Sequence, residues 1–335
     1  MTTQASQGVE PYSLPDHALI GEAKNIQVDA ATPVVTISPL IIPAPGRLVP
    51  LQIKVSAPTT GTHLPILLLS HGHGRSNNLS SLNGYAPLAN FWASHGFIVI
   101  QPTHLSSKSL SLDSETPGAP LFWRSRVEDM KHILDHLDLI EDSFTGVHGR
   151  LDRSRVAVAG HSAGTHTAGM LLGQQLTDED GTVVDLLEPR IKAGVLLGAL
   201  GNGGDDLSES AFKNFPFARH PDFSSMKTPT LVVTGDLDIS PHFTIRGADW
   251  HADPYTLGPS PKSLLSLINA WHIFGGISGY DARETEEDES PERVGLVQRL
   301  TWAYLRSALY PGDSAWSTAC AAFEKLDKLG KIENK

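Results

Sequence analysis

Short apolar runs that lack polar alternation are the feature that most restricts the folds open to this chain. Such runs occupy residues 63–70, 97–103, 155–160, 191–200, 228–235 and 262–269. Each is shorter than the roughly 20 residues that span a bilayer. Segments with helical apolar spacing lie between them, at 86–96, 123–141, 167–176 and 293–309. Strands buried on both faces and separated by helices predict an α/β fold, with a mostly parallel central sheet and helices on both faces.

The N-terminal part departs from this alternation. Residues 33–58 resemble two strands joined by a turn near Pro45 and Gly46, which predicts an N-terminal antiparallel hairpin. Residues 1–30 are polar and are expected to form a flexible arm, followed by a single domain over 31–312 and a helical tail over 313–335. Loop insertions in the domain are expected near 104–123, 200–225 and 240–261.

Charge and cysteine content exclude several classes of function. The chain of 335 residues has a formal net charge of -11, and an acidic surface repels phosphate backbones, so no nucleic-acid partner is expected. Its one cysteine, Cys320, allows no intrachain disulfide and no cysteine cluster for zinc. The N-terminal residues show no secretory signal, so a cytoplasmic protein without a membrane span is expected, and a homodimer is compatible with the sequence.

The sequence Gly160-His161-Ser162-Ala163-Gly164 directly follows a predicted strand and precedes a predicted helix. The pattern Gly-x-Ser-x-Gly is weak by itself, but in this context it predicts a sharp turn that exposes the serine at the carboxyl edge of the sheet. The two glycines have no side chain, and so tight a turn leaves no room for one. Ser162 is therefore the predicted nucleophile.

A serine hydroxyl needs a base within hydrogen-bond reach, and an acid must orient that base. In proteins with this turn, the acid comes next in the chain and the histidine comes last. His272 follows the last predicted core strand and enters a glycine-rich loop, which makes it the predicted base. The alternatives after Ser162 are His166, His220, His242 and His251.

Two aspartates directly follow the predicted strand 228–235. Asp238 lies deeper in the loop and is the predicted acid, whereas Asp236 is the reserve and is expected to close the turn. Asp249 and Asp253 are more distant alternatives.

The sequence His71-Gly72-His73 ends another predicted strand. A tetrahedral intermediate needs two N–H donors, and the backbone amides of His73 and Ala163 are predicted to provide them. The ring of His71 is expected to shape the loop through a local hydrogen bond. A metal site that adds His104 or His161 is the alternative, but no cysteine or carboxylate motif lies nearby, so no metal is expected.

Aromatic and apolar side chains in the insertions suggest a pocket for an apolar or aromatic ester. The predicted lining comprises Phe122, Trp123, Phe215, Trp271 and His161, and further candidates are Leu121, Phe212, Phe217 and Trp250.

Three blocks together resemble the α/β-hydrolases grouped as predicted dienelactone hydrolases, whose relatives include chlorophyllases and platelet-activating-factor acetylhydrolases. They are PILLLSHGHGRSNN with YAPLANFWASHGFIVIQPTH, then RVAVAGHSAG, then GDLD with AWHIFGGISGY. The resemblance covers roughly residues 50–205 and 228–310. It implies the α/β-hydrolase fold and a serine hydrolase of carboxylic esters without a cofactor. Ser162 stands where the enzymes that name the group have cysteine, and Ala163 and Thr165 depart from the chlorophyllase pattern.

The expected function is therefore hydrolysis of a small-molecule carboxylic ester through an acyl-enzyme. Acyl transfer, or hydrolysis of an amide, carbamate or lactone, remains an alternative because the same triad serves these reactions. A hydrolase-like binding protein without catalysis is the alternative from another class.

Overall fold

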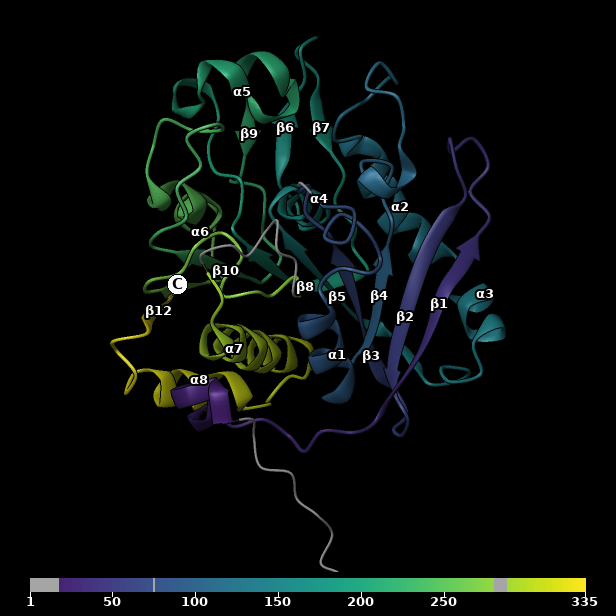
Figure 1. Ribbon diagram of the computed structural model, residues 1–335, viewed down its shortest axis with the longest axis vertical. Helices are drawn as coiled ribbons and strands as arrows, with labels where there is room; N and C mark the ends of the chain where they lie inside the picture. The colour runs from purple at the N-terminus through teal and green to yellow at the C-terminus, as the bar shows by residue number, and fades with distance from the viewer. Residues whose placement is uncertain (1–17, 75, 280–287) are drawn as a thin grey trace, which may run out of the picture.

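The computed structural model describes residues 18–74, 76–279 and 288–335, and its centre is a nine-stranded sheet (Figure 1). The strand order is β1-β2-β4-β3-β5-β8-β10-β11-β12. These strands are β1 (Val34–Ile42), β2 (Leu51–Pro58), β3 (Leu64–Ser70), β4 (Ile98–Pro102), β5 (Leu151–His161), β8 (Ile191–Leu197), β10 (Thr230–Gly235), β11 (Lys262–Leu267) and β12 (Gly330–Asn334).

The six strands from β4 to β11 in this order run parallel, and they coincide with the predicted apolar runs. Every residue of β3 and β10 is buried, because helices cover the sheet on both faces. The predicted fold class is therefore confirmed.

At one edge, β1 and β2 form the predicted antiparallel hairpin. Its turn lies where the sequence predicted it: Gly46 has a φ of 84°, and the amide of Arg47 donates to the carbonyl of Ala44 at 3.1 Å. Strand β2 then pairs antiparallel with β4 and joins the hairpin to the parallel strands.

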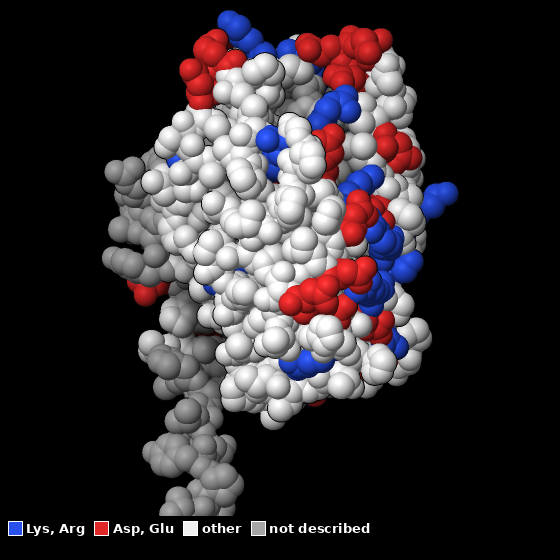
Figure 2. Space-filling model, turned by 90° about the vertical axis from the view of Figure 1, so that its right-hand side faces the viewer, with Lys and Arg blue, Asp and Glu red and all other residues white. Residues whose placement is uncertain are grey.

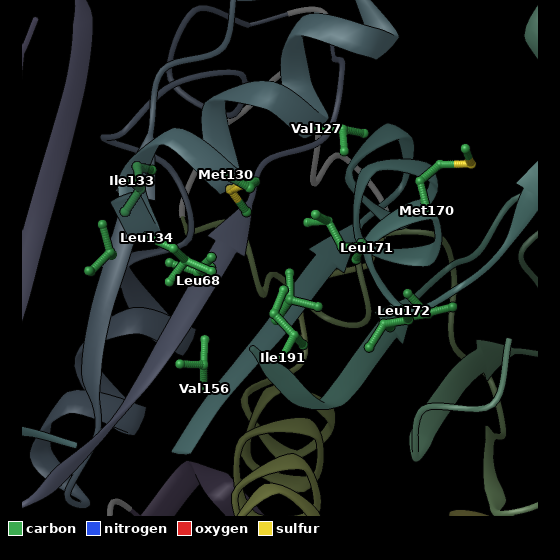
Figure 3. Close-up of a cluster of buried hydrophobic side chains, with 14 of the residues drawn as sticks. Leu68, Val127, Met130, Ile133, Leu134, Val156, Met170, Leu171, Leu172 and Ile191 are labelled. Carbon is green, nitrogen blue, oxygen red and sulfur yellow. The ribbon is translucent and has the colours of Figure 1, made fainter. Parts of the chain in front are cut away.

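Two layers of helices cover the sheet. Helices α2 (Trp123–Asp135), α3 (Leu137–Ser143) and α4 (Ala163–Leu171) share one buried cluster with residues of β3, β5 and β8, part of which Figure 3 shows. The second cluster lies on the other face of the sheet and contains the remaining, alternate side chains of the strands. The helices that cover it are α1 (Ala86–Ser94), α7 (Pro291–Leu309) and α8 (Ala315–Phe323). The short helices α5 (Glu209–Asn214) and α6 (Asp253–Leu257) lie in the insertions.

Two predicted helices have different bounds in the structure. The segment 123–141 contains two helices, because His136 adopts φ −117° and ψ 25° and breaks the helical backbone. The segment 167–176 was predicted as one helix, but α4 ends at Leu171 and residues Gln175–Thr177 form strand β6. Strand β6 pairs with β7 (Val183–Asp185) and β9 (Pro221–Asp222) in a small second sheet, so part of the insertion 200–225 is sheet.

Both predictions for the chain ends need correction. Residues 1–17 of the predicted arm lie outside the described residues, but Ala18–Asn25 form a 3-10 helix, η1, against α7. It is held there because Ala23 and Ile26 are buried and Arg299 donates to the carbonyl of Ile26 at 2.7 Å. The tail is only partly helical: after α8, strand β12 pairs antiparallel with β11 and closes the far edge of the sheet.

The surface charges are mixed on the face in Figure 2, where acidic and basic side chains are interspersed. Ion pairs such as those of Arg153 with Asp138 and Glu141 neutralise part of the negative charge locally. Among the described residues, no helix has the length and apolar composition needed to cross a membrane.

Candidate active site

Ser162 occupies a strained turn between β5 and α4. Its backbone has φ 54° and ψ −124°, a region that residues with a side chain rarely adopt. The neighbouring glycines permit the turn, since a Cβ on Gly160 would lie 2.1 Å from the carbonyl oxygen of Gly164, and one on Gly164 would lie 2.2 Å from that of Ser70. The turn therefore packs directly on the end of β3, where the His-Gly-His segment begins.

His272 and Asp238 are joined by a hydrogen bond. Nδ1 of His272 lies 2.8 Å from Oδ2 of Asp238, which is 1% exposed. Burial alone would raise the pKa of Asp238, but the charge and hydrogen bonds of His272 and His251 outweigh it and hold this pKa below the usual aspartate range. A carboxylate ionised in this way orients the imidazole and stabilises its protonated form.

The other acidic candidates have different partners. Asp236 accepts a hydrogen bond from the amide of Ala270 at 3.2 Å, which fixes the loop that carries His272. Asp249 and Asp253 bind the guanidinium of Arg246. The structure therefore brings Asp238, and none of these three, to His272.

Of the other four histidine candidates, two lie elsewhere and two line the cavity that contains Ser162. His166 is buried against Trp123 and Phe217, and His220 is exposed beside the small second sheet. His242 lines the same cavity as Ser162. His251 lines this cavity too, and its Nε2 is 3.2 Å from Oδ1 of Asp238. The sequence contains no local signal for this contact.

One cavity of about 590 Å³ contains Ser162, Asp238, His272, His73 and Ala163 together. Its apolar wall consists of Leu121, Leu200, Phe215, Ile239, Phe243 and Trp250. All five residues predicted for the triad and the oxyanion hole therefore line a single cavity.

The predicted pocket lining is correct in part. Phe215, Leu121 and Trp250 line this cavity. Trp123 packs in the core against His166, and Phe122 lines a separate cavity beside Arg47, because both belong to the start of α2 and its packing. Trp271 points outward and is 43% exposed. Of the remaining candidates, Phe217 packs beside Trp123, and Phe212 is 43% exposed.

The ring of His71 fixes the peptide unit that carries the amide of His73. Its Nδ1 donates to the carbonyl of Gly72 at 2.7 Å, and its Nε2 accepts from the amide of His104 at 3.1 Å. Because a trans peptide holds its C=O and N–H in opposite directions, binding of the Gly72 carbonyl also sets the direction of the His73 N–H. The prediction that this ring shapes the loop is confirmed, and both of its nitrogens are used, which leaves none for a metal.

His161 connects this loop to the loop of His272. Its Nε2 donates to the carbonyl of His272 at 2.8 Å, so its Nδ1 accepts from the hydroxyl of Tyr85 at 2.7 Å. The same hydroxyl accepts from the amide of Gly72 at 2.9 Å. Burial lowers the pKa of His161 to about 3, so the ring is neutral. His161 was predicted as pocket lining, but it lies beneath the site because β5 directs it into the core.

A buried guanidinium lies under the same loop. Arg126 donates to Thr167 Oγ1 at 2.9 Å, to Ser106 Oγ at 2.6 Å, to Ser70 Oγ at 3.2 Å and to the carbonyl of His71. Burial lowers the pKa of Arg126 to about 10, which leaves it charged at neutral pH. Its contacts tie helix α2 to the end of β3.

Asp238, His251 and His272 place ligand atoms within 4.8 Å of one another. A tetrahedral zinc with bonds of about 2.0–2.1 Å would separate two ligand atoms by about 3.3 Å. The distance from His272 Nδ1 to Asp238 Oδ2 is 2.8 Å, which is a hydrogen bond. The geometry of this cluster therefore fits proton sharing and does not fit tetrahedral coordination.

Part of the chain matches a known protein family. Residues 23–180 match the sequence profile of the family described as Chlorophyllase, a range that includes His73, Ser162 and Ala163.

Several curated relatives are cutinases. Cutinase 1 of Thermobifida cellulosilytica is 30% identical over 184 residues, which cover 54% of this chain and 52% of the relative. Cutinase 2 of the same organism is 28% identical over 182 residues, 54% of this chain and 52% of the relative. Cutinase est1 of Thermobifida alba is 28% identical over 189 residues, 56% of this chain and 47% of the relative. The chain thus spans about half the length of the curated relatives that it matches.

Proposed function

Because the chain is an α/β-hydrolase of the chlorophyllase-like group, we propose that it hydrolyses carboxylic esters through an acyl-enzyme on Ser162. The observation that carries this proposal is the position of Ser162: a strained turn exposes it in the same cavity as the hydrogen-bonded pair of His272 and Asp238. The names of the relatives, which are cutinases, support the same reaction class.

The reaction begins when Oγ of Ser162 attacks the ester carbonyl and His272 takes its proton. The amides of His73 and Ala163 hold the oxyanion, and Ala163 is suited to this because the first N–H groups of a helix have no partner within the helix. His272 then protonates the leaving alcohol. Water attacks the acyl-enzyme with the same assistance, and the carboxylic acid leaves. Asp238 keeps the ring of His272 oriented in both halves of the reaction.

The cavity favours an apolar substrate group. Its wall of Leu121, Leu200, Phe215, Phe243 and Trp250 gains free energy by burying an acyl chain or an aromatic ring, about 25 cal/mol for each Å² removed from water. A volume of about 590 Å³ has room for a medium-length acyl group.

A panel of p-nitrophenyl esters of increasing acyl length, together with a fluorophosphonate, tests this function. We expect hydrolysis of the short and medium esters, and one phosphonyl group on the peptide that contains Ser162, found by mass spectrometry. Inactivity toward every ester, or a label on another peptide, would refute the proposal. Turnover of anilides or lactones in place of esters would assign the triad to the corresponding reaction.

The His73 amide can be tested separately from its ring. We expect His73→Ala to retain kcat/KM within about threefold, since only the backbone N–H is required, whereas His73→Pro removes the donor and should lose about 10²–10³-fold. Steady-state kinetics with circular dichroism as the folding control measures both. A His73→Ala variant as impaired as His272→Ala would assign a catalytic function to the ring instead.

A further inference from the structure

A buried histidine outside the catalytic cavity joins three segments beneath the loop that carries the His73 amide. His104 follows β4 and is 0% exposed. Its Nε2 lies 3.0 Å from Oγ of Ser70 at the end of β3, and its Nδ1 lies 2.9 Å from Oδ2 of Asp129 on α2. Arg47, from the turn of the hairpin, donates to both oxygens of Asp129, at 2.8 and 3.2 Å. The ring therefore links the end of β3 to α2 and to the hairpin.

The partners of the His104 ring determine which nitrogen carries its proton. Burial, with the positive charges of Arg126 and Arg47, holds the pKa of His104 well below its usual range, so the ring is neutral and has one N–H. Burial raises the pKa of Asp129 to about 6, so at pH 8 its oxygens only accept. Nδ1 of His104 therefore donates to Asp129, and Nε2 accepts from the hydroxyl of Ser70.

Ser70, His104 and Asp129 have the same order of contacts as the proposed triad, but they have no access to a substrate. Ser70 is 0% exposed, and its Oγ also accepts from Arg126 at 3.2 Å. None of the three residues lines the cavity that contains Ser162. Any effect of this set on the reaction must therefore pass through the residues that it holds.

His104 holds two successive residues in front of the His73 amide. Its ring binds Ser70, and its backbone N–H donates to Nε2 of His71 at 3.1 Å. The rings of His104 and His71 also lie side by side, with centroids 4.8 Å apart. His71 in turn binds the carbonyl of Gly72, and the N–H of that peptide unit belongs to His73. A displacement of His104 would therefore turn the His73 amide.

We propose that His104, held by Asp129, is a positioning residue that aims the His73 amide at the oxyanion. This inference rests on the proposed function, because it places the His73 amide in the oxyanion hole. An oxyanion donor contributes only when it points at the developing charge, so a change in its direction slows the chemical step. Binding of the ester by the apolar wall of the cavity does not depend on this direction. Loss of the contact should therefore lower kcat and leave KM nearly unchanged.

Two substitutions separate the two contacts of the ring. The amide of asparagine takes the place of Nδ1 and can still bind Asp129, whereas the amide of glutamine takes the place of Nε2 and can still bind Ser70. With the best p-nitrophenyl ester at pH 8, we expect His104→Asn to lower kcat about 10–50-fold, less than complete loss of an oxyanion donor. His104→Gln should stay within about fivefold of the wild type. His148→Asn, at an exposed histidine, is the matched control and should retain wild-type kcat.

Combination with His73→Pro tests whether His104 acts through the amide of His73. In this background the donor is already absent, so His104→Asn should lower kcat by less than about a further twofold. A histidine that only supports the fold would cost the same factor in both backgrounds. That result, or equal losses in His104→Asn and His104→Gln, would overturn the proposal. Titration of Ser162 with the fluorophosphonate corrects each kcat for the folded fraction, and Ser70→Ala removes the same contact from its other end if His104→Asn does not fold.

Hydrogen exchange followed by mass spectrometry provides a readout that does not depend on catalysis. In His104→Asn the amides of residues 70–74 should exchange faster than in the wild type, while those of β10 and β11 should be unchanged. Unchanged exchange at residues 70–74 would refute the proposal. If the wild type hydrolyses no ester while exchange at these residues increases, the proposed function fails and the positioning of the loop by His104 stands.

Discussion

Ser162→Ala is expected to lower kcat on the ester panel by on the order of 10⁴–10⁶-fold, with KM changed little. The variant keeps the cavity, the proposed oxyanion amides and the pair of His272 and Asp238, but it has no nucleophile. The small residual rate would come from water attacking a substrate that the site still orients. Burst kinetics should show no acyl-enzyme, and the fluorophosphonate should no longer label the protein.

The double variant with His272→Ala distinguishes a catalytic unit from two independent contributions. Since the serine has no function without its base, Ser162→Ala with His272→Ala should be no slower than the slower single variant. Ser210→Ala and His220→Ala are matched controls at surface positions of the insertions and should retain wild-type kcat. Additive losses would mean that the two residues do not act together, and undiminished turnover by Ser162→Ala would exclude it as the nucleophile.

The features of the fold and the site that the sequence predicts correctly are set by residues that lie close together in the chain. The parallel strands are continuous apolar runs, and the turn at Ser162 is set by Gly160 and Gly164, which lie within two residues of it. The preference for Asp238 over Asp236 agrees with the contacts, because the loop turns Asp236 back to the amide of Ala270 and Asp238 toward His272.

The features that the sequence does not predict depend on contacts between segments that lie far apart in the chain. Strand β12 is a polar segment, GKIEN, that becomes a strand only because the edge of β11 is free to pair with it. His251 contacts the carbonyl of Ala199 and the carboxylate of Asp238, which come from different loops. The cavity lining was predicted only in part, since Trp123 and Trp250 look alike in sequence, but Trp123 packs beside His166 and Phe217 whereas Trp250 lines the cavity that contains Ser162.

Arg126→Met is expected to cost about 3–5 kcal/mol of unfolding free energy, the largest effect expected outside the catalytic residues, because four buried acceptors would lose the same donor at about 1 kcal/mol for each hydrogen bond. Methionine fills much of the space but donates no hydrogen bond. The hydroxyls of Ser70, Ser106 and Thr167 and the carbonyl of His71, all in buried residues, would lose their common donor. Since the carbonyl of His71 precedes the loop that carries the His73 amide, kcat/KM should also fall at temperatures where the variant remains folded.

Arg124→Met provides the comparison, because Arg124 is on the same helix two residues earlier. Its side chain is 47% exposed and pairs with Asp178 at the surface, so its loss should cost less than about 1 kcal/mol. Chemical denaturation followed by fluorescence gives both free energies. Equal losses in the two variants would mean that the guanidinium beneath the loop contributes no more than a surface charge. A large loss only in Arg126→Met, with reduced kcat/KM, would show that one buried cation supports both the fold and the loop that is proposed to bind the oxyanion.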